Sequence, residues 1–171
     1  MVDSVLIDTL NLQARDFAVR WKTLIKKSPH LKHYHSMSDE ELIDINVKYY
    51  PLLAKTLDRG LDRASVGDFF VKIGKTREKA AFPVSEVLYG LNLSQQVVIG
   101  YLMTDFVHDS TVRMYQAMGI VNRVSEFFLL GCFYITKGFL EATYKEMSQT
   151  DKVSEELLKK YFRDDFFFKN D

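Results

Sequence analysis

The chain has 171 residues, enough for one domain that buries roughly two thirds of the surface its unfolded form exposes. Apolar residues make up 47% and charged residues 27%, which is typical of a folded globular protein and excludes a disordered one. The 23 basic residues equal the 23 acidic ones, so no net field attracts nucleic acid or an anionic membrane.

The first predicted helix covers residues 3 to 27, where apolar side chains recur at helical spacing. Trp21 is the expected core anchor of this helix. Pro29 ends it, because the residue before a proline avoids the helical region of backbone space. The connector that follows contains three of the four histidines, which are His30, His33 and His35.

The second predicted helix begins with a capping box. The Ser38 hydroxyl can accept from the amide of Glu41, and the Glu41 carboxylate can accept from the Ser38 amide in return. Pro51 lies inside the helical pattern, so we expect a kink or a break near Tyr50. Gly60 is expected to end the element.

Two further helices are predicted on either side of Pro83. The first starts at the helix-initiating pair Ser65 and Asp68 and carries Arg77 on its apolar face. The second extends from Pro83 to about Phe106. Proline fits the first turn of this helix because its missing amide hydrogen costs nothing there.

The longest predicted helix covers residues 121 to 147 and continues a segment that begins near Thr111. Two apolar stripes run along it at steps of three and four residues. The first stripe consists of Val124, Phe128, Gly131, Ile135, Gly138 and Ala142. The second consists of Leu129, Phe133, Thr136, Leu140, Thr143 and Met147.

A helix that is apolar on two sides is either central in its own core or shared with another chain. The glycines of the first stripe remove side chains where a second helix could approach closely. We therefore expect a homodimer in which the first stripe of each long helix forms the interface. The alternative is a core helix that is covered by other helices of its own chain.

A short helix from about 152 to 163 and an aromatic tail complete the chain. No strand alternation, repeat or second domain boundary occurs. The prediction is a single all-α helical-bundle domain over 1–171 with about five to seven helices. Its core covers about 3–147, and the short helix and tail occupy 150–171, where three phenylalanines in a row are expected to dock.

The expected environment is the cytoplasm. Cys132 has no second cysteine to pair with and lies in an apolar stretch, which favours a small core residue over a reactive thiolate. Acidic residues stand where an export signal would be basic. The longest uncharged run, 87–104, carries Asn92 and Gln96 near its middle, so we expect a buried helix and no membrane span.

Arg77 and His108 are the candidate ligand-binding residues. Arg77 can extend to the edge of its face, pair with Glu86 or Glu126, or contact an anionic ligand. His108 could serve as a haem ligand or, with Asp109 beside it, as a phosphoacceptor. The default interpretation is a helix-terminal histidine favoured by the helix dipole.

No cofactor, metal or catalytic activity is predicted. The three connector histidines could hold a nickel, zinc or copper ion, but a structural zinc site usually needs four ligands and no carboxylate stands nearby before Asp39. The paired acids Glu155-Glu156 and Asp164-Asp165 are neighbours in sequence, and neighbouring residues on a helix do not face one another. Nucleophilic triads and phosphate-binding loops are also missing from the sequence.

The segment from Gly74 to Leu93, GKTREKAAFPVSEVLYGLNL, carries the matches to a known family. Together with the early tryptophan and the SMSDEEL motif, it resembles the N-terminal sensor domain of RsbR and RsbRD type co-antagonists of the stressosome, also found ahead of some sensor histidine kinases. The matching residues are Gly74, Arg77, Pro83, Glu86, Val87, Leu88 and Leu91. The likeness covers about 16–143.

The resemblance implies a non-haem, globin-like helical domain that dimerises and passes a signal to an output module. No STAS or kinase domain follows before Asp171, so that module is expected in trans or in a longer protein. We therefore expect a non-catalytic sensory domain. The alternatives are a small-molecule or haem-binding globin-like protein and the N-terminal fragment of a sensor histidine kinase.

Overall fold

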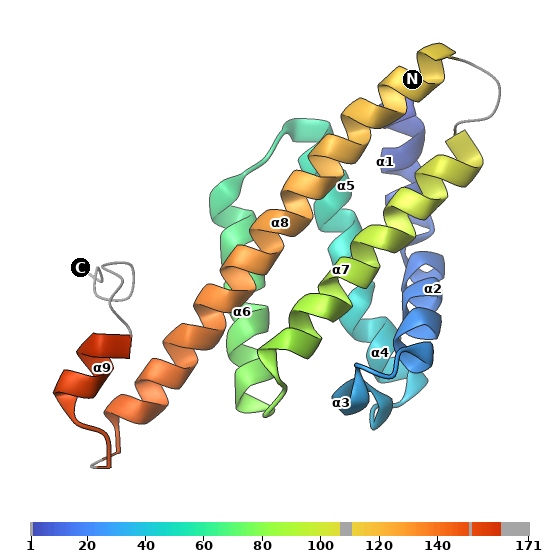
Figure 1. The fold of residues 1–171 in the computed structure, drawn as a ribbon. Coiled ribbons are helices and arrows are strands. Elements are labelled where there is room, and N and C mark those ends of the chain that lie inside the picture. Colours follow the sequence, from blue (N-terminus) through green and yellow to red (C-terminus); the bar gives the residue numbers. More distant parts are fainter. Residues whose placement is uncertain (1, 107–110, 151, 162–171) are drawn as a thin grey trace.

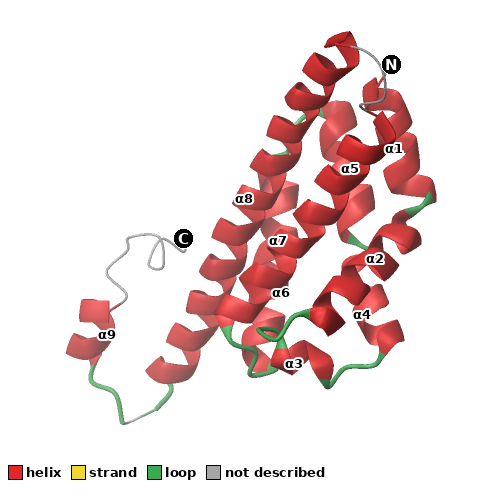
Figure 2. Ribbon diagram, turned by 45° about the vertical axis from the view of Figure 1, so that its right-hand side comes forward, coloured by secondary structure: helices red, strands yellow, loops and turns green. Residues whose placement is uncertain are grey.

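The computed structural model describes residues 2–106, 111–150 and 152–161. Every regular element in these ranges is a helix, and no strand occurs in them (Figure 2). The all-helical prediction is therefore confirmed. The helices are α1 (Val2–Leu12), α2 (Ala14–Lys27), α3 (Lys32–His35), α4 (Asp39–Asn46), α5 (Tyr49–Arg59), α6 (Arg63–Lys79), α7 (Val84–Tyr101), the π-helical turn η1 (Leu102–Phe106), α8 (Thr111–Ser148) and α9 (Glu155–Tyr161).

The 38-residue helix α8 is the axis on which the other helices are arranged. Helices α6 and α7 both pack along it, while α1 packs against α5 and α2 contacts both α4 and α7 (Figure 1). The short helix α9 lies beside the C-terminal end of α8. The prediction that the long helix begins near Thr111 is confirmed.

Two predicted helices are each divided in the structure. The first breaks at Gln13, whose φ of −114° and ψ of 23° leave the helical region, so that α1 can follow α5 while α2 turns towards α4 and α7. The second breaks at Val47 and Lys48. Pro51 then falls in the first turn of α5, where it needs no amide hydrogen, so the break expected near Tyr50 is found three residues earlier.

Side-chain caps start α4 and α6. The capping box at Ser38 is present, with the Ser38 amide donating to Glu41 Oε2 over 2.7 Å. The start predicted at Ser65 is wrong, because the capping residue lies three positions earlier. Asp62 is the cap of α6 and accepts from the amides of Ala64 and Ser65, and the Ser65 hydroxyl donates to the same carboxylate.

The core contains an anchored tryptophan and a buried polar network. Trp21 is 1% exposed and its indole N–H donates to the Gly90 carbonyl over 2.7 Å. Between α4 and α7, the Asn46 amide donates to the Ser94 hydroxyl over 2.7 Å, and Asn46 accepts from the Tyr50 hydroxyl. Because each of these buried polar groups has a partner, the network costs little and fixes α4 and α5 against α7.

The first apolar stripe of α8 lies inside this chain's own core. Val124, Phe128 and Ile135 are fully buried, and Gly131 faces the side chains of Phe70 and Leu91. Ala142, the last of the stripe, is half-buried. The prediction that this stripe forms a dimer interface is therefore wrong, because α6 and α7 of the same chain already cover it.

Glycines bring α6 and α8 into backbone contact. A methyl group on Gly138 would overlap the carbonyl oxygen of Val71, and one on Gly74 would overlap the carbonyl oxygen of Ile135. The close approach predicted from the glycines of the long helix is therefore present. The helix that approaches is α6 of the same chain.

Candidate functional site

Arg77 lies in the last turn of α6, and its guanidinium stacks on two aromatic rings. Its central carbon is 4.9 Å from the centre of the Phe82 ring and 5.7 Å from that of Tyr34, which is cation–π geometry. Neither of the predicted acid partners contacts it, because Glu86 bonds His33 and Glu126 faces Arg63. No described carboxylate forms an ion pair with Arg77.

The turn after α6 holds this stack together. The Phe82 amide donates to the Arg77 carbonyl over 3.0 Å, and the Ala81 amide donates to the Glu78 carbonyl over 2.8 Å. These are the two hydrogen bonds of a Schellman motif. Ala81 has a φ of 57°, a conformation that glycine adopts without strain and alanine does not. Tyr34 completes the stack, edge-on to Phe82 at 4.9 Å and to Trp21 at 5.9 Å.

Replacing Ala81 by glycine is expected to stabilise the fold by about 1 kcal/mol, because the strain of the left-handed conformation disappears. Ala80 has a φ of −86° and provides the control. Glycine there should destabilise by about 0.5–1 kcal/mol through added chain entropy. Urea unfolding followed by circular dichroism measures both, and changes of the same sign would contradict the assigned turn.

A groove of about 550 Å³ runs between α4 and α6 and begins at Arg77. Its volume lies within the range of small-molecule sites. The lining residues are Met37, Glu41, Asp44, Ile45, Lys48, Tyr49, Phe69, Lys72, Ile73, Thr76 and Arg77. Apolar side chains thus form its walls, with charged groups around them.

Tyr49 places a hydroxyl in this groove. The residue is 5% exposed, and its ring lies 5.8 Å from Phe69 and 5.9 Å from Phe70. Burial raises the pKa of Tyr49 to about 12, although the positive charge of Arg77 opposes the shift. The phenol therefore keeps its proton at neutral pH, and no described residue forms a hydrogen bond with it.

The charged side chains along the groove differ in whether they have hydrogen-bond or ion-pair partners. Glu41 is held by Ser38 at the start of α4, which lowers the pKa of its carboxyl group. Lys48 and Lys72 form no ion pair with any described residue. Asp44 likewise forms no ion pair with any described residue, so the lining carries three cations, Lys48, Lys72 and Arg77, against two carboxylates. This balance favours an anion.

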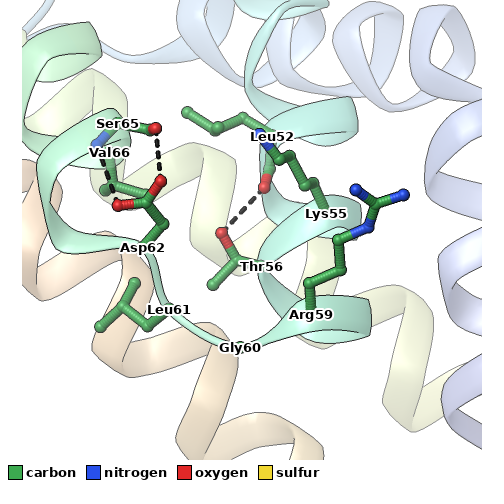
Figure 3. A pocket seen from close by; sticks show the side chains of 9 residues that line it. All are labelled: Leu52, Lys55, Thr56, Arg59, Gly60, Leu61, Asp62, Ser65 and Val66. Atoms are coloured by element: carbon green, nitrogen blue, oxygen red, sulfur yellow. Dashed lines mark hydrogen bonds between the residues drawn. The ribbon is translucent and has the colours of Figure 1, made fainter.

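Two other cavities are less suited to a ligand. One of about 340 Å³ lies at the turn between α5 and α6 (Figure 3). Its polar groups are used locally, since Thr56 donates to the Leu52 carbonyl and Ser65 to Asp62. The other, about 370 Å³ near His30 and Tyr89, contains Glu86, which already binds His33.

The connector histidines do not converge. His33 Nδ1 lies 2.8 Å from Glu86 and His35 Nε2 lies 3.0 Å from the Ile25 carbonyl oxygen, while the His30 ring faces Tyr89. Within the described residues, no three histidine, cysteine or acidic side chains are placed to hold a metal ion. His108, the other predicted ligand-binding residue, lies outside the described residues.

The second apolar stripe of α8 is largely exposed. We call Met118, Leu129, Phe133 and Leu140 the outer stripe, and Leu129 and Phe133 are 67% and 51% exposed. The positions in line with them are uncharged, namely Asn122, Ser125, Thr136, Thr143 and Met147, whereas Glu126 and Lys137 border the stripe beside Phe133. An uncharged apolar side of this length is characteristic of an interaction surface.

The segment Tyr115–Ser148 of α8 is long and apolar enough to cross a membrane by length and composition alone. A third of its most apolar window is buried. Core helices of soluble proteins meet the same criteria, so this is weak evidence for a membrane span. The contacts of α8 with α6 and α7 account for this buried part.

Comparison with known proteins identifies no relative of this chain. No protein-family model, curated protein or solved structure matches the chain. The likeness to stressosome sensor domains accordingly stays a prediction from the sequence.

Proposed function

We propose that this chain is a non-catalytic sensory domain that pairs with a second copy through the outer stripe of α8 and relays a stimulus to an output module. The outer stripe is the observation that carries the proposal. It displays four large apolar side chains to solvent, in a chain that has charged residues at more than a quarter of its positions.

A second copy suits this surface because of its charge. Around a two-fold axis the same patch faces itself, so a charge on it would meet a like charge, whereas an uncharged patch meets no repulsion. At about 1.5 Å per residue, the side from Met118 to Met147 is roughly 44 Å long. Two such helices, aligned along this length, would form the centre of the proposed dimer.

The contact between α6 and α8 gives this pair a route for a signal. Helix α6 lines the groove with Phe69, Ile73 and Arg77, and its Gly74 touches the backbone of α8. Since backbone contacts leave no side chain to absorb a displacement, a shift of α6 at the groove moves α8 with it. Pairing through α8 would carry that shift to the partner copy.

Sedimentation velocity over a range of protein concentrations tests the pairing. The wild-type chain is expected to form dimers, and the double variant Leu129→Glu, Phe133→Glu is expected to sediment as a monomer because four buried charges would meet in the interface. Leu12→Glu is the matched control. Leu12 is 85% exposed on α1, so this variant should dimerise like the wild type.

A wild-type chain that stays monomeric throughout, or a double variant that still dimerises, would contradict the proposal. Flotation with lipid vesicles separates one further case. If the wild type floats with the vesicles and the double variant does not, the outer stripe binds a membrane and the pairing is wrong.

A further inference from the structure

We propose that the groove between α4 and α6 binds a small carboxylate with an apolar body. Arg77 and the Tyr49 hydroxyl hold the carboxylate, and Phe69 and Ile73 contact the body. This ligand class gives the proposed sensory role its stimulus, but the site itself lies within a single copy of the chain.

The guanidinium of Arg77 is arranged to receive an anion. Its central carbon lies over the Phe82 and Tyr34 rings, and these contacts hold the guanidinium in place. No described carboxylate forms an ion pair with it, since Glu86 bonds His33 and Glu126 faces Arg63, so its N–H donors are available to a ligand in the groove. A carboxylate accepts two such donors side by side, which makes it the natural partner of an arginine held in this way.

The Tyr49 hydroxyl supplies a second donor from the opposite wall. It stands at the start of α5, in a side chain that is 5% exposed, and no described group bonds it. Since no buried side-chain oxygen or nitrogen among the described residues lacks a partner, this hydroxyl is open to the groove, where a ligand oxygen would take the place of water as its partner. Tyr49 and Arg77 line the same groove, so a ligand seated in it meets both donors.

The rest of the groove determines the body and the charge of the ligand. Met37, Ile45, Phe69 and Ile73 line it, so the body is apolar, and 550 Å³ admits a two-ring molecule. Glu41 and Asp44 on the α4 side would repel a second negative charge. A monoanion such as a carboxylate therefore fits better than a phosphate dianion.

Isothermal titration calorimetry with 2-naphthylacetate tests the site, with 2-naphthylacetamide as the uncharged probe of the same shape. The acid is expected to bind saturably and at least about tenfold more tightly than the amide, since charge-assisted hydrogen bonds are the stronger ones. Saturable binding absent up to millimolar acid, or equal binding of the two probes, would overturn the proposal.

Two variants assign the binding to the named residues. Arg77→Gln should lower the affinity for 2-naphthylacetate by roughly ten- to a hundredfold. Tyr49→Phe, which keeps the packed ring, should lower it by roughly three- to tenfold. Lys79→Gln removes a positive charge two residues from Arg77, outside the groove, and should leave the affinity unchanged. Thermal unfolding confirms that each variant is folded before titration.

Wild-type affinity in Arg77→Gln and Tyr49→Phe, or an equal loss in Lys79→Gln, would show that the acid binds elsewhere. The titration is repeated with the double variant Leu129→Glu, Phe133→Glu. Its affinity should match the wild type, because the groove lies on α4, α5 and α6. Failure of the site and failure of the pairing are thus observed separately.

Discussion

Replacing Gly138 by alanine is expected to destabilise the folded chain by at least about 2 kcal/mol, although alanine is the better helix former. The added methyl group would overlap the carbonyl oxygen of Val71 and lie 2.9 Å from its carbonyl carbon. These are backbone atoms of α6 and cannot rotate away as a side chain can. The two helices must move apart, and the packing along their shared length is lost with them.

Gly74→Ala tests the same contact from the other helix. Its methyl group would overlap the Ile135 carbonyl oxygen and lie 2.9 Å from the Phe139 nitrogen, so a similar loss is expected. Gly119→Ala is the control on α8, since nothing lies within 4 Å of the added carbon. That variant should gain about 0.5–1 kcal/mol from helix propensity.

Urea unfolding followed by far-ultraviolet circular dichroism measures the three variants. Gly138→Ala and Gly74→Ala should unfold at lower urea than the wild type, and Gly119→Ala at higher urea. If Gly138→Ala were as stable as Gly119→Ala, α6 and α8 would not be in backbone contact. The proposed route from the groove to the outer stripe would then fail as well.

Local signals in the sequence were sufficient where the chemistry is local. The capping box at Ser38, the stop before Pro29 and the start of the long helix near Thr111 each depend on residues a few positions apart, and each is found. The break at Gln13 was missed because the apolar period continues through it. Only the packing of α1 on α5 requires the chain to turn there.

The two stripes of α8 show what periodicity leaves undetermined. Helical spacing gives the directions in which Phe128 and Phe133 point, roughly 140° apart around the helix axis, but not what lies opposite each of them. The chain's own α6 and α7 cover Phe128, whereas Phe133 is left half-exposed. Periodicity therefore indicates more apolar surface than one neighbouring helix covers, but it placed the interface on the stripe that the chain itself buries.

The candidate site was only half predictable for a related reason. Arg77 stood out because a charge on an apolar helix face needs an explanation, and its acid partners proved to be engaged elsewhere. Tyr49 gave no such signal, since a tyrosine within an apolar stripe is ordinary core composition. Its role depends on α4 and α6 lying far enough apart to leave a groove, which follows from tertiary packing.

Phe128→Ala is expected to cost about 3–5 kcal/mol of folding stability, the loss typical of a fully buried phenylalanine. Phe128 is completely enclosed and packs edge-on against Phe127 with ring centres 5.2 Å apart. Removing the ring leaves a cavity between α8 and its neighbours that the surrounding helices cannot fill. The adjacent Leu129 is 67% exposed, so Leu129→Ala should change the stability of the monomer by less than about 0.5 kcal/mol.

Comparing Phe128→Ala with Leu129→Ala distinguishes between the two possible positions of a dimer interface on α8. Both substitutions are measured by urea unfolding in the Phe133→Glu background, which places charges in the proposed interface and leaves Leu129 in place to be substituted. A large loss for Phe128→Ala there means that one chain alone buries the first stripe. A loss below about 1 kcal/mol would mean that the stripe is solvent-exposed in the monomer, and the interface would return to Val124, Phe128 and Ile135, where the sequence first placed it.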